Sequence, residues 1–220
     1  MVDGRYRAHV SEGRLITIEG LDGAGKSTLA AKLAQAIAQR GVRVELLREP
    51  GGVALSERIR ELVKDPSLSV GGRAEALLYA AARAELVHER VRPLLEQGAI
   101  VLLDRFVDSS LAYQGAGRGL GVEQVRAINL FATGEVIPAR TLLLRIAPAT
   151  RRGRLHTRGE ERDRLEREDE RFFATIATAY DELARADPQR IRCIDGEQPP
   201  ARVLEQALDE IEDLLPELGD

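Results

Sequence analysis

The chain has 220 residues, 44% of them hydrophobic and 31% charged, with a formal net charge of −4 at pH 7, so it can bury a sizeable core in one large domain. No apolar run approaches the roughly 18 residues that cross a bilayer, and one cysteine with three histidines excludes both an intramolecular disulfide and a Cys/His metal cluster. Because tryptophan is absent and the charge balance is slightly acidic, we expect a cytoplasmic protein that binds small ligands, with no nucleic-acid and no membrane partner.

Short apolar segments alternate with helical segments along the chain. After a polar tail at 1–13, strands are predicted at 15–18, 42–47, 99–103, 141–146 and 191–194. Helices are predicted at 29–40, 53–64, 73–96, 122–133 and 201–215. A further helix is predicted after the charged stretch 151–171, and it ends near residue 186. This alternation predicts an α/β fold with a five-stranded parallel sheet. Without an internal repeat or a linker, residues 1–220 are interpreted as a single domain, and Cys193 is expected to be buried in the last strand.

A glycine-rich segment joins the first predicted strand to the first predicted helix. It reads Gly20-Leu21-Asp22-Gly23-Ala24-Gly25-Lys26-Ser27-Thr28 and fits the P-loop pattern G-x-x-x-x-G-K-[ST]. In such a loop backbone N–H groups surround the phosphates of a nucleotide, and the start of the following helix adds a partial positive charge. Lys26, one of only three lysines, would contact the β- and γ-phosphates, and Ser27 would bind Mg²⁺.

Charged residues stand where the second and third predicted strands end. Arg48 follows the second strand, and Asp104 and Arg105 follow the third. Open α/β sheets bind ligands at this end of their strands. A guanidinium there can clamp a phosphate with two parallel hydrogen bonds, and Asp104 can hold Mg²⁺ directly or through water. A switch GTPase is excluded because the chain has no N-K-x-D segment, and the length favours a small-molecule kinase over an ATPase machine.

Several segments, in the same order, resemble bacterial thymidylate kinases over nearly all of the chain from Arg14 onward. They are Ile18 to Thr28, Arg48-Glu49-Pro50-Gly51-Gly52, Leu77 to Arg83, Asp104-Arg105-Phe106, Ser109 to Gly119, Arg158-Gly159 and Asp163-Arg164-Leu165-Glu166. The resemblance implies a P-loop NTPase fold with three α/β/α layers and a short helical lid. It also implies that the protein phosphorylates dTMP to dTDP with Mg-ATP, a step of dTTP synthesis, and forms a homodimer.

The resemblance also assigns roles in the acceptor pocket. Arg48 and Arg105 would clamp the phosphate of the acceptor, and Asp22 would face its sugar and 3′-hydroxyl. Tyr79 would stack on thymine, where the family usually has phenylalanine, and Arg83, one helical turn later, would read the exocyclic oxygen of the base. The residues near the base and the 2′ side of the sugar would be Ser110, Tyr113 and Gln114. A ring against C2′ would exclude a ribose hydroxyl and favour a deoxynucleotide.

A charged stretch at 150–165 resembles the lid that closes over ATP. Some family members carry the catalytic arginine inside the P-loop, whereas members with only glycine and alanine at these positions supply it from the lid. In this chain Gly23 and Ala24 occupy these P-loop positions. We assign the role to Arg158. The alternatives are Arg154 and Arg164, and the expected catalytic set is Lys26, Asp104, Arg105 and Arg158.

Two other functions stay open from the sequence. A kinase for another nucleoside monophosphate, or for a deoxynucleoside, would not use Tyr79, Arg83 and Tyr113 as a pocket for thymine and deoxyribose. A non-catalytic regulator would bind ATP without turnover and would tolerate loss of the lid arginines. The adjacent Asp104 and Arg105, together with the lid arginines, argue against the regulator.

Overall fold

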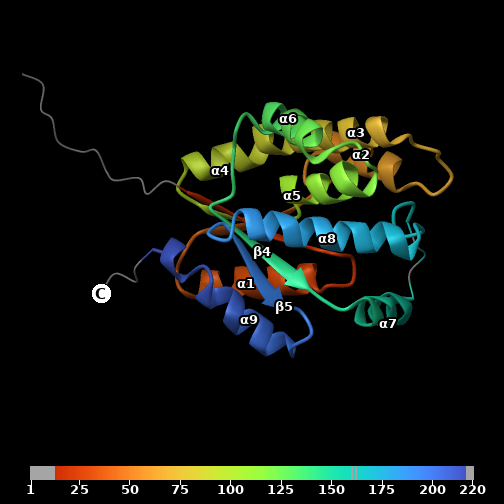
Figure 1. Ribbon diagram of the computed structural model, residues 1–220. Coiled ribbons are helices and arrows are strands. Elements are labelled where there is room, and N and C mark those ends of the chain that lie inside the picture. The colour runs from red at the N-terminus through yellow and green to blue at the C-terminus, as the bar shows by residue number, and fades with distance from the viewer. Residues whose placement is uncertain (1–12, 160, 162, 217–220) are drawn as a thin grey trace, which may run out of the picture.

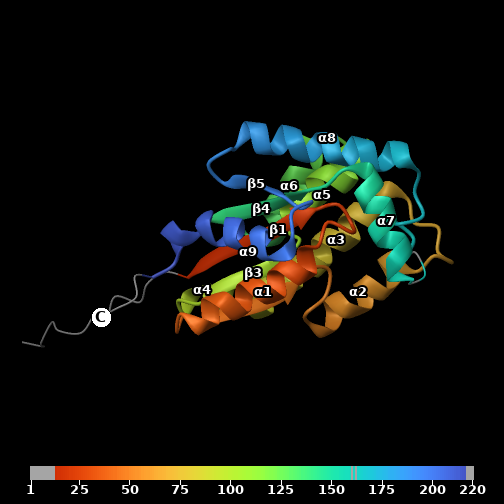
Figure 2. The ribbon, with the colours of Figure 1, turned by 90° about the horizontal axis from the view of Figure 1, so that it is seen from below.

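Five parallel strands form the centre of the molecule. The computed structural model describes residues 13–159, 161 and 163–216, without the side chain of Arg158, so the tail expected at 1–13 lies outside the described residues except for Gly13. The strands are β1 (Arg14–Gly20), β2 (Val44–Arg48), β3 (Ile100–Asp104), β4 (Arg140–Arg145) and β5 (Ile191–Asp195). Their order in the sheet is β2-β3-β1-β4-β5, which confirms the predicted α/β fold with a five-stranded parallel sheet. Figure 2 labels four of these strands, β3, β1, β4 and β5.

Helices connect the strands and cover both faces of the sheet. The α-helices are α1 (Lys26–Gln39), α2 (Ala54–Lys64), α3 (Gly72–Leu86), α4 (Arg92–Glu96), α5 (Val107–Ser110), α6 (Val122–Thr133), α7 (Pro148–Arg158), α8 (Glu170–Ala186) and α9 (Pro200–Asp209). Two π-helical segments are η1 (Val87–Val91) and η2 (Leu111–Gly117), and a 3₁₀ turn is η3 (Glu212–Leu214). Helices α1 and α9 lie on one side of the sheet and α3, α6 and α8 on the other (Figures 1 and 2). Within the described part of the chain, no helix is both long enough and apolar enough to cross a membrane.

The alternation of side chains along each strand explains why both faces are covered. Successive residues of a strand point to opposite faces of its sheet. Ile16 and Leu102 pack in one cluster with α1 and α9, whereas Leu15 and Val101 pack in another with α3, η1 and α4. Leu143 of β4 packs against aromatic residues of α8. The continuous apolar runs of the sequence are therefore strands buried on both sides.

Three segments differ from the sequence-based expectations. The helix predicted at 73–96 contains the π-helical turn η1, and the closing helix ends at Asp209. The glycine-rich stretch at 115–121, where no helix was predicted, is helical up to Gly117. A Cβ atom on Gly117 would come within 2.8 Å of the Phe172 ring, so this glycine permits close packing between η2 and α8.

Cys193 is exposed, and the expectation of a buried cysteine was wrong. It lies in β5, which forms one edge of the sheet. Ile191 and Ile194 of this strand are buried, but Cys193 lies at a position that the helices leave uncovered. A strand at the edge of a sheet therefore does not bury all of its apolar residues.

Candidate functional site

An open cavity of about 610 Å³ lies at the C-terminal ends of β1, β2 and β3. Its wall is formed by the P-loop, the ends of β2 and β3, helices α2 and α3, the π-helical segment η2 and the segment that follows α7. Most of the side chains predicted to act on substrates line it: Asp22, Lys26, Ser27, Arg48, Tyr79, Arg83, Asp104, Arg105, Ser110, Tyr113 and Gln114. The structure thus brings together residues that lie up to 92 positions apart in the sequence, from Asp22 to Gln114. The side chain of Arg158 lies outside the described residues.

The P-loop connects the end of β1 to the start of α1. Gly20 has a φ of 133°, and a Cβ atom there would lie 2.5 Å from the carbonyl oxygen of Leu144, so the tight turn requires glycine. Gly25 has a left-handed backbone conformation, with a φ of 97°, and α1 begins directly after it at Lys26. Backbone N–H groups at the start of α1 are therefore available to a phosphate. The loop members that do not line the cavity are Gly20, Leu21, Gly23, Ala24, Gly25 and Thr28.

Lys26 presents a buried positive charge to the cavity. Its Nζ donates to the carbonyl oxygen of Leu21 at 3.0 Å and lies 4.0 Å from Oδ1 of Asp22. Burial and the nearby positive charge of Arg105 lower the pKa of Lys26 to about 8. The nearby carboxylates therefore do not fully offset burial and the charge of Arg105 in the free protein. A bound phosphate would add negative charge beside the ammonium and stabilise its protonated form.

Ser27 and Asp104 lie side by side at the start of α1 and the end of β3. The hydroxyl of Ser27 donates to Oδ2 of Asp104 at 2.7 Å. A hydroxyl and a carboxylate are the hard oxygen ligands that Mg²⁺ accepts, usually together with water and substrate phosphates. The pair therefore fits the predicted Mg²⁺ site, although the described residues contain no cluster of three or more acidic, histidine or cysteine side chains that could hold a metal without a substrate.

Arg105 forms the centre of a polar network between the P-loop and η2. Its φ is 72°, an uncommon value for a residue with a side chain. Nη2 donates to Asp22 Oδ1 at 2.6 Å and to the Tyr113 hydroxyl at 3.3 Å, and Nη1 donates to the backbone oxygen of Gly20 and to Oγ of Ser109. Burial alone would raise the pKa of Asp22, but Arg105 and then Lys26 hold it below its usual range. Asp22 is therefore a fixed anion between two cations.

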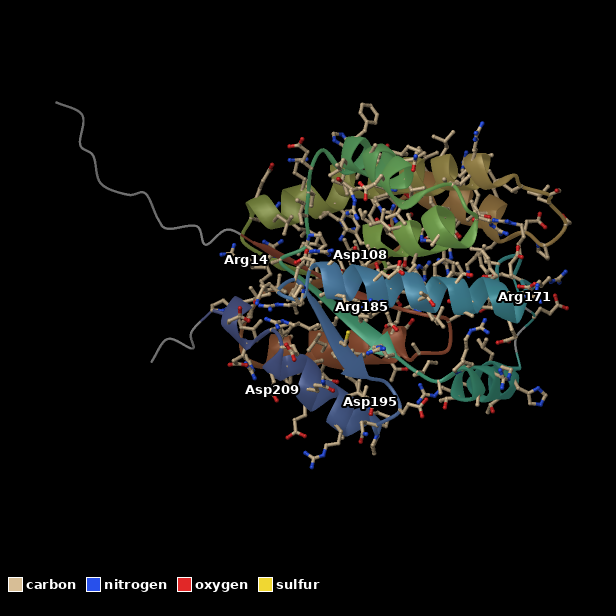
Figure 3. All side chains as sticks on the ribbon, viewed as in Figure 1. Arg14, Asp108, Arg171, Arg185, Asp195 and Asp209 are labelled. Atoms are coloured by element: carbon tan, nitrogen blue, oxygen red, sulfur yellow. The ribbon has the colours of Figure 1, made fainter. Side chains whose placement is uncertain are left out.

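Glu19 supports the segment that carries Arg105, and the sequence-based reasoning missed it. It is fully buried, and its carboxylate accepts from the backbone N–H of Phe106 at 2.7 Å and from the hydroxyl of Tyr180 at 2.9 Å. Ser109 donates to it from both its backbone N–H and its hydroxyl. Burial and then the charge of Asp108, labelled in Figure 3, raise the pKa of Glu19. An acidic residue directly after the strand predicted at 15–18 was the signal that could have identified it.

The guanidinium of Arg83 is already held by several hydrogen bonds within the protein, so it is not free to turn toward a base. It is buried, and Nε donates to Glu49 Oε2 at 2.7 Å, while Nη1 donates to Ser110 Oγ at 2.9 Å and to Asn129. Nη2 donates to the backbone oxygen of Phe106 at 3.0 Å. Burial raises the pKa of Glu49 to about 7, although Arg83 opposes that rise. The structure thus adds Glu49 to the site, and the contact of Arg83 with a base stays a prediction.

Tyr79 both packs into the protein and faces the cavity. Its ring lies against the small cluster of Ile59, Val63 and Ala82, and it also lines the cavity wall. On α3 it lies one helical turn before Arg83, as the sequence predicted. The packing of Tyr79 against this cluster is therefore compatible with the predicted stacking on a base, which stays a prediction.

Arg48 is the most exposed of the predicted phosphate ligands. Its side chain is 58% exposed, and Nη2 donates to Oε1 of Glu57 at 2.9 Å. The same Glu57 oxygen accepts from the backbone N–H of Gly52 at 2.8 Å. A phosphate at Arg48 would therefore compete with Glu57, which the sequence-based reasoning also missed.

Of the three candidate lid arginines, the structure describes the side chains of Arg154 and Arg164, and these two occupy different environments. Arg154 of α7 donates to the backbone oxygens of Gly23 and Ala24 at 3.3 and 3.2 Å, so the helix contacts the P-loop. Arg164 is tied down instead: Nη1 lies 2.7 Å from Oε2 of Glu75, and Nε donates to the backbone oxygen of Val63. The geometry therefore argues against Arg164 as the alternative catalytic arginine, because its charge is already used to hold the segment after α7.

Comparisons with known proteins agree with this geometry. The family model for thymidylate kinases matches residues 18–207. Thymidylate kinases of Deinococcus radiodurans and Halorhodospira halophila are 45% and 43% identical over 190 and 206 residues, which cover 86% and 93% of this chain and 92% and 96% of theirs. The crystal structure of thymidylate kinase from Ehrlichia chaffeensis superimposes with a TM-score of 0.72 at 29% identity and covers 90% of this chain and 97% of that one. The chain belongs to the thymidylate kinase family.

Proposed function

We propose that the cavity binds dTMP with its phosphate at Arg105 and its base beside Tyr79. As a thymidylate kinase, the chain converts dTMP to dTDP, a step of dTTP synthesis, with ATP as the phosphate donor. The observation that carries the substrate arrangement is that Lys26 of the P-loop and Arg105 line one cavity and share the anion Asp22. Two phosphorylated ligands can therefore meet between two fixed cations.

The catalytic groups of this chain act mainly by positioning and by neutralising charge. An oxygen of the dTMP phosphate is already anionic and can attack the γ-phosphorus in line, so no general base is required. Lys26 would bind oxygens of the donor, while Arg105, helped by Arg48, would hold the acceptor phosphate. Asp22 would orient the sugar through its 3′-hydroxyl, and the ring of Tyr113 would exclude a 2′-hydroxyl.

Metal and lid residues would complete the donor side. Ser27 and Asp104 would hold Mg²⁺, which when bound offsets the charge of the phosphates. Arg158, or Arg154 from the same helix, would approach the transferred group when α7 closes and excludes water. We place this reaction in the cytoplasm, where both nucleotides are available.

An ADP-release assay with Mg-ATP tests the proposed acceptor. The monophosphates compared at equal concentration are dTMP, dUMP, ribothymidine monophosphate (the ribose form of dTMP), dCMP, AMP and GMP. We expect turnover to be largely confined to dTMP. Tyr113→Ala should relax the discrimination between the deoxy and ribo forms by about tenfold, because the ring no longer fills the space beside C2′. Preferred turnover of another base would reject the thymine pocket, and ATP binding without any turnover would favour the regulator.

We also propose a homodimer that is formed through α3 and α6. These neighbouring helices expose large apolar side chains: Leu77 is 57%, Leu130 43% and Phe131 92% exposed. Covering such a surface is favourable because apolar area leaves water. Sedimentation at micromolar concentration should give twice the mass of the chain, and Phe131→Asp should shift the protein to monomer. A monomeric parent protein would contradict the proposal.

A further inference from the structure

Glu75 is a buried carboxylate that joins three distant segments next to the cavity. It lies on α3, and none of its surface is exposed. Nε2 of Gln114 donates to its Oε1 at 2.9 Å. Arg118 donates to both carboxylate oxygens, at 3.2 and 3.1 Å, and Nη1 of Arg164 lies 2.7 Å from Oε2. The two guanidinium groups offset the cost of burying the negative charge.

This contact fixes the orientation of the Gln114 side chain. An ionised carboxylate only accepts hydrogen bonds, so the NH₂ group of Gln114 must face Glu75. Gln114 itself lines the cavity, and among the residues that the structure describes none donates to its Oε1. The side chain therefore leaves a hydrogen-bond acceptor for a ligand, and it cannot exchange this oxygen for the NH₂ group while Glu75 is charged.

We infer that Glu75 is a positioning residue for base selection, acting through Gln114. The inference rests on the proposed function and concerns which pyrimidine the site accepts. Thymine has a ring N3–H that can donate to Oε1 of Gln114, whereas the N3 of cytosine is itself an acceptor. A cytosine at this place would bring two acceptors together and leave both without a donor, which a buried site does not tolerate well.

The test compares two substrates that differ only on one edge of the ring. In 5-methyl-dCMP the 5-methyl group and the deoxyribose of dTMP are kept, while N3–H and O4 are replaced by N3 and an amino group. The measured quantity is the ratio of kcat/KM for dTMP to kcat/KM for 5-methyl-dCMP. Glu75→Gln should lower this ratio by at least about tenfold, because Gln114 can then turn its NH₂ group toward N3 of the cytosine.

Glu168→Gln provides a matched control. Glu168 accepts from Nη1 of the same Arg118 at 2.6 Å, but it does not contact Gln114 among the hydrogen bonds of the described residues. Its replacement should leave the substrate ratio unchanged even if stability falls. A drop in the ratio that is equal in both variants would show that the effect comes from Arg118, and would overturn the role of Glu75.

A second variant keeps the inference testable if Glu75→Gln does not fold. Gln114→Leu preserves the ion pairs of Glu75 with Arg118 and Arg164 and should lower the same ratio, because the acceptor oxygen is removed. An unchanged ratio in either variant, with dTMP still phosphorylated by the parent protein, would overturn this inference alone. A parent protein that does not phosphorylate dTMP would instead contradict the proposed function.

Discussion

A Lys26→Met variant is expected to lose about 10²- to 10³-fold in kcat while it remains folded. Lys26 is the buried cation of the P-loop, and a phosphate between it and Arg105 would be stabilised most as charge moves in the transition state. Methionine has a similar length and fills the same space without the charge. Steady-state ADP release with saturating Mg-ATP and dTMP measures the loss. Lys32→Met, which removes an exposed lysine from the same helix, is the matched control and should retain full activity.

The depressed pKa of Lys26 gives this variant a second signature. The pKa is about 8 in the folded protein, against an ordinary value of 10.5, so between these pH values the unfolded chain holds a proton that the folded chain has released. The free energy of unfolding of the parent protein should therefore gain a favourable contribution as pH rises from about 8 to 10.5. In Lys26→Met this contribution is absent. Urea unfolding of both proteins at pH 7 and pH 10 measures the difference, and an equal pH dependence in the two would contradict the assignment.

Calorimetry in buffers of different ionisation enthalpy tests the same group without a mutation. At pH 8 about half of the Lys26 side chains are protonated in the free protein. ATP should raise the pKa and draw up to about half a proton from solution. Binding without proton uptake would mean that Lys26 does not contact the phosphates.

Local sequence patterns were sufficient to predict the fold and the phosphate-binding end of the cavity, whereas the residues beside the base and the sugar were implied only by the family resemblance. The P-loop motif, the apolar strands and the charged residues directly after β2 and β3 are each contained in a few consecutive residues. Because parallel strands bring their C-terminal ends to one edge of a sheet, the pattern of strands alone places Arg48 and Arg105 together. The sheet confirms that placement.

The supporting contacts could not be predicted because they join residues that are distant in the sequence. Glu19 bonds to Tyr180, and Glu75 bonds to Gln114 and Arg164, across separations from 39 to 161 residues. Nothing local distinguishes an acid that will be buried against arginines from one on a solvated helix face. For the same reason the sequence could not tell that Arg164 is held by Glu75 while Arg154 contacts the P-loop.

Arg105→Gln is expected to lower kcat/KM for dTMP by about 10³-fold or more, while the dissociation constant for ATP changes little. Arg105 is the cation on the acceptor side of the cavity, and glutamine cannot replace its charge or its paired donors. A lower kcat/KM for dTMP with an unchanged dissociation constant for ATP would show that only the binding of the acceptor phosphate is lost. A general disruption of the fold would weaken the binding of both substrates. Arg145→Gln is the matched control, since Arg145 pairs with Asp181 on the surface and is 55% exposed.

The same substitution should also destabilise the protein, because Asp22, whose side chain is 25% exposed, is left as a partly buried anion with only the more distant Lys26 beside it. Without Arg105, less positive charge opposes the effect of burial on the carboxyl group. The pKa of Asp22 should therefore rise from its low value in the parent protein. The stability that this ionised carboxylate contributes is present above its ordinary pKa of 3.8 and is lost as pH falls through the folded value, so Arg105→Gln should unfold at a higher pH during acid titration. Adding Asp22→Asn should recover most of the lost stability but none of the activity on dTMP. If the double variant regained activity, Arg105 would act only as the partner of Asp22 and not as the ligand of the acceptor phosphate.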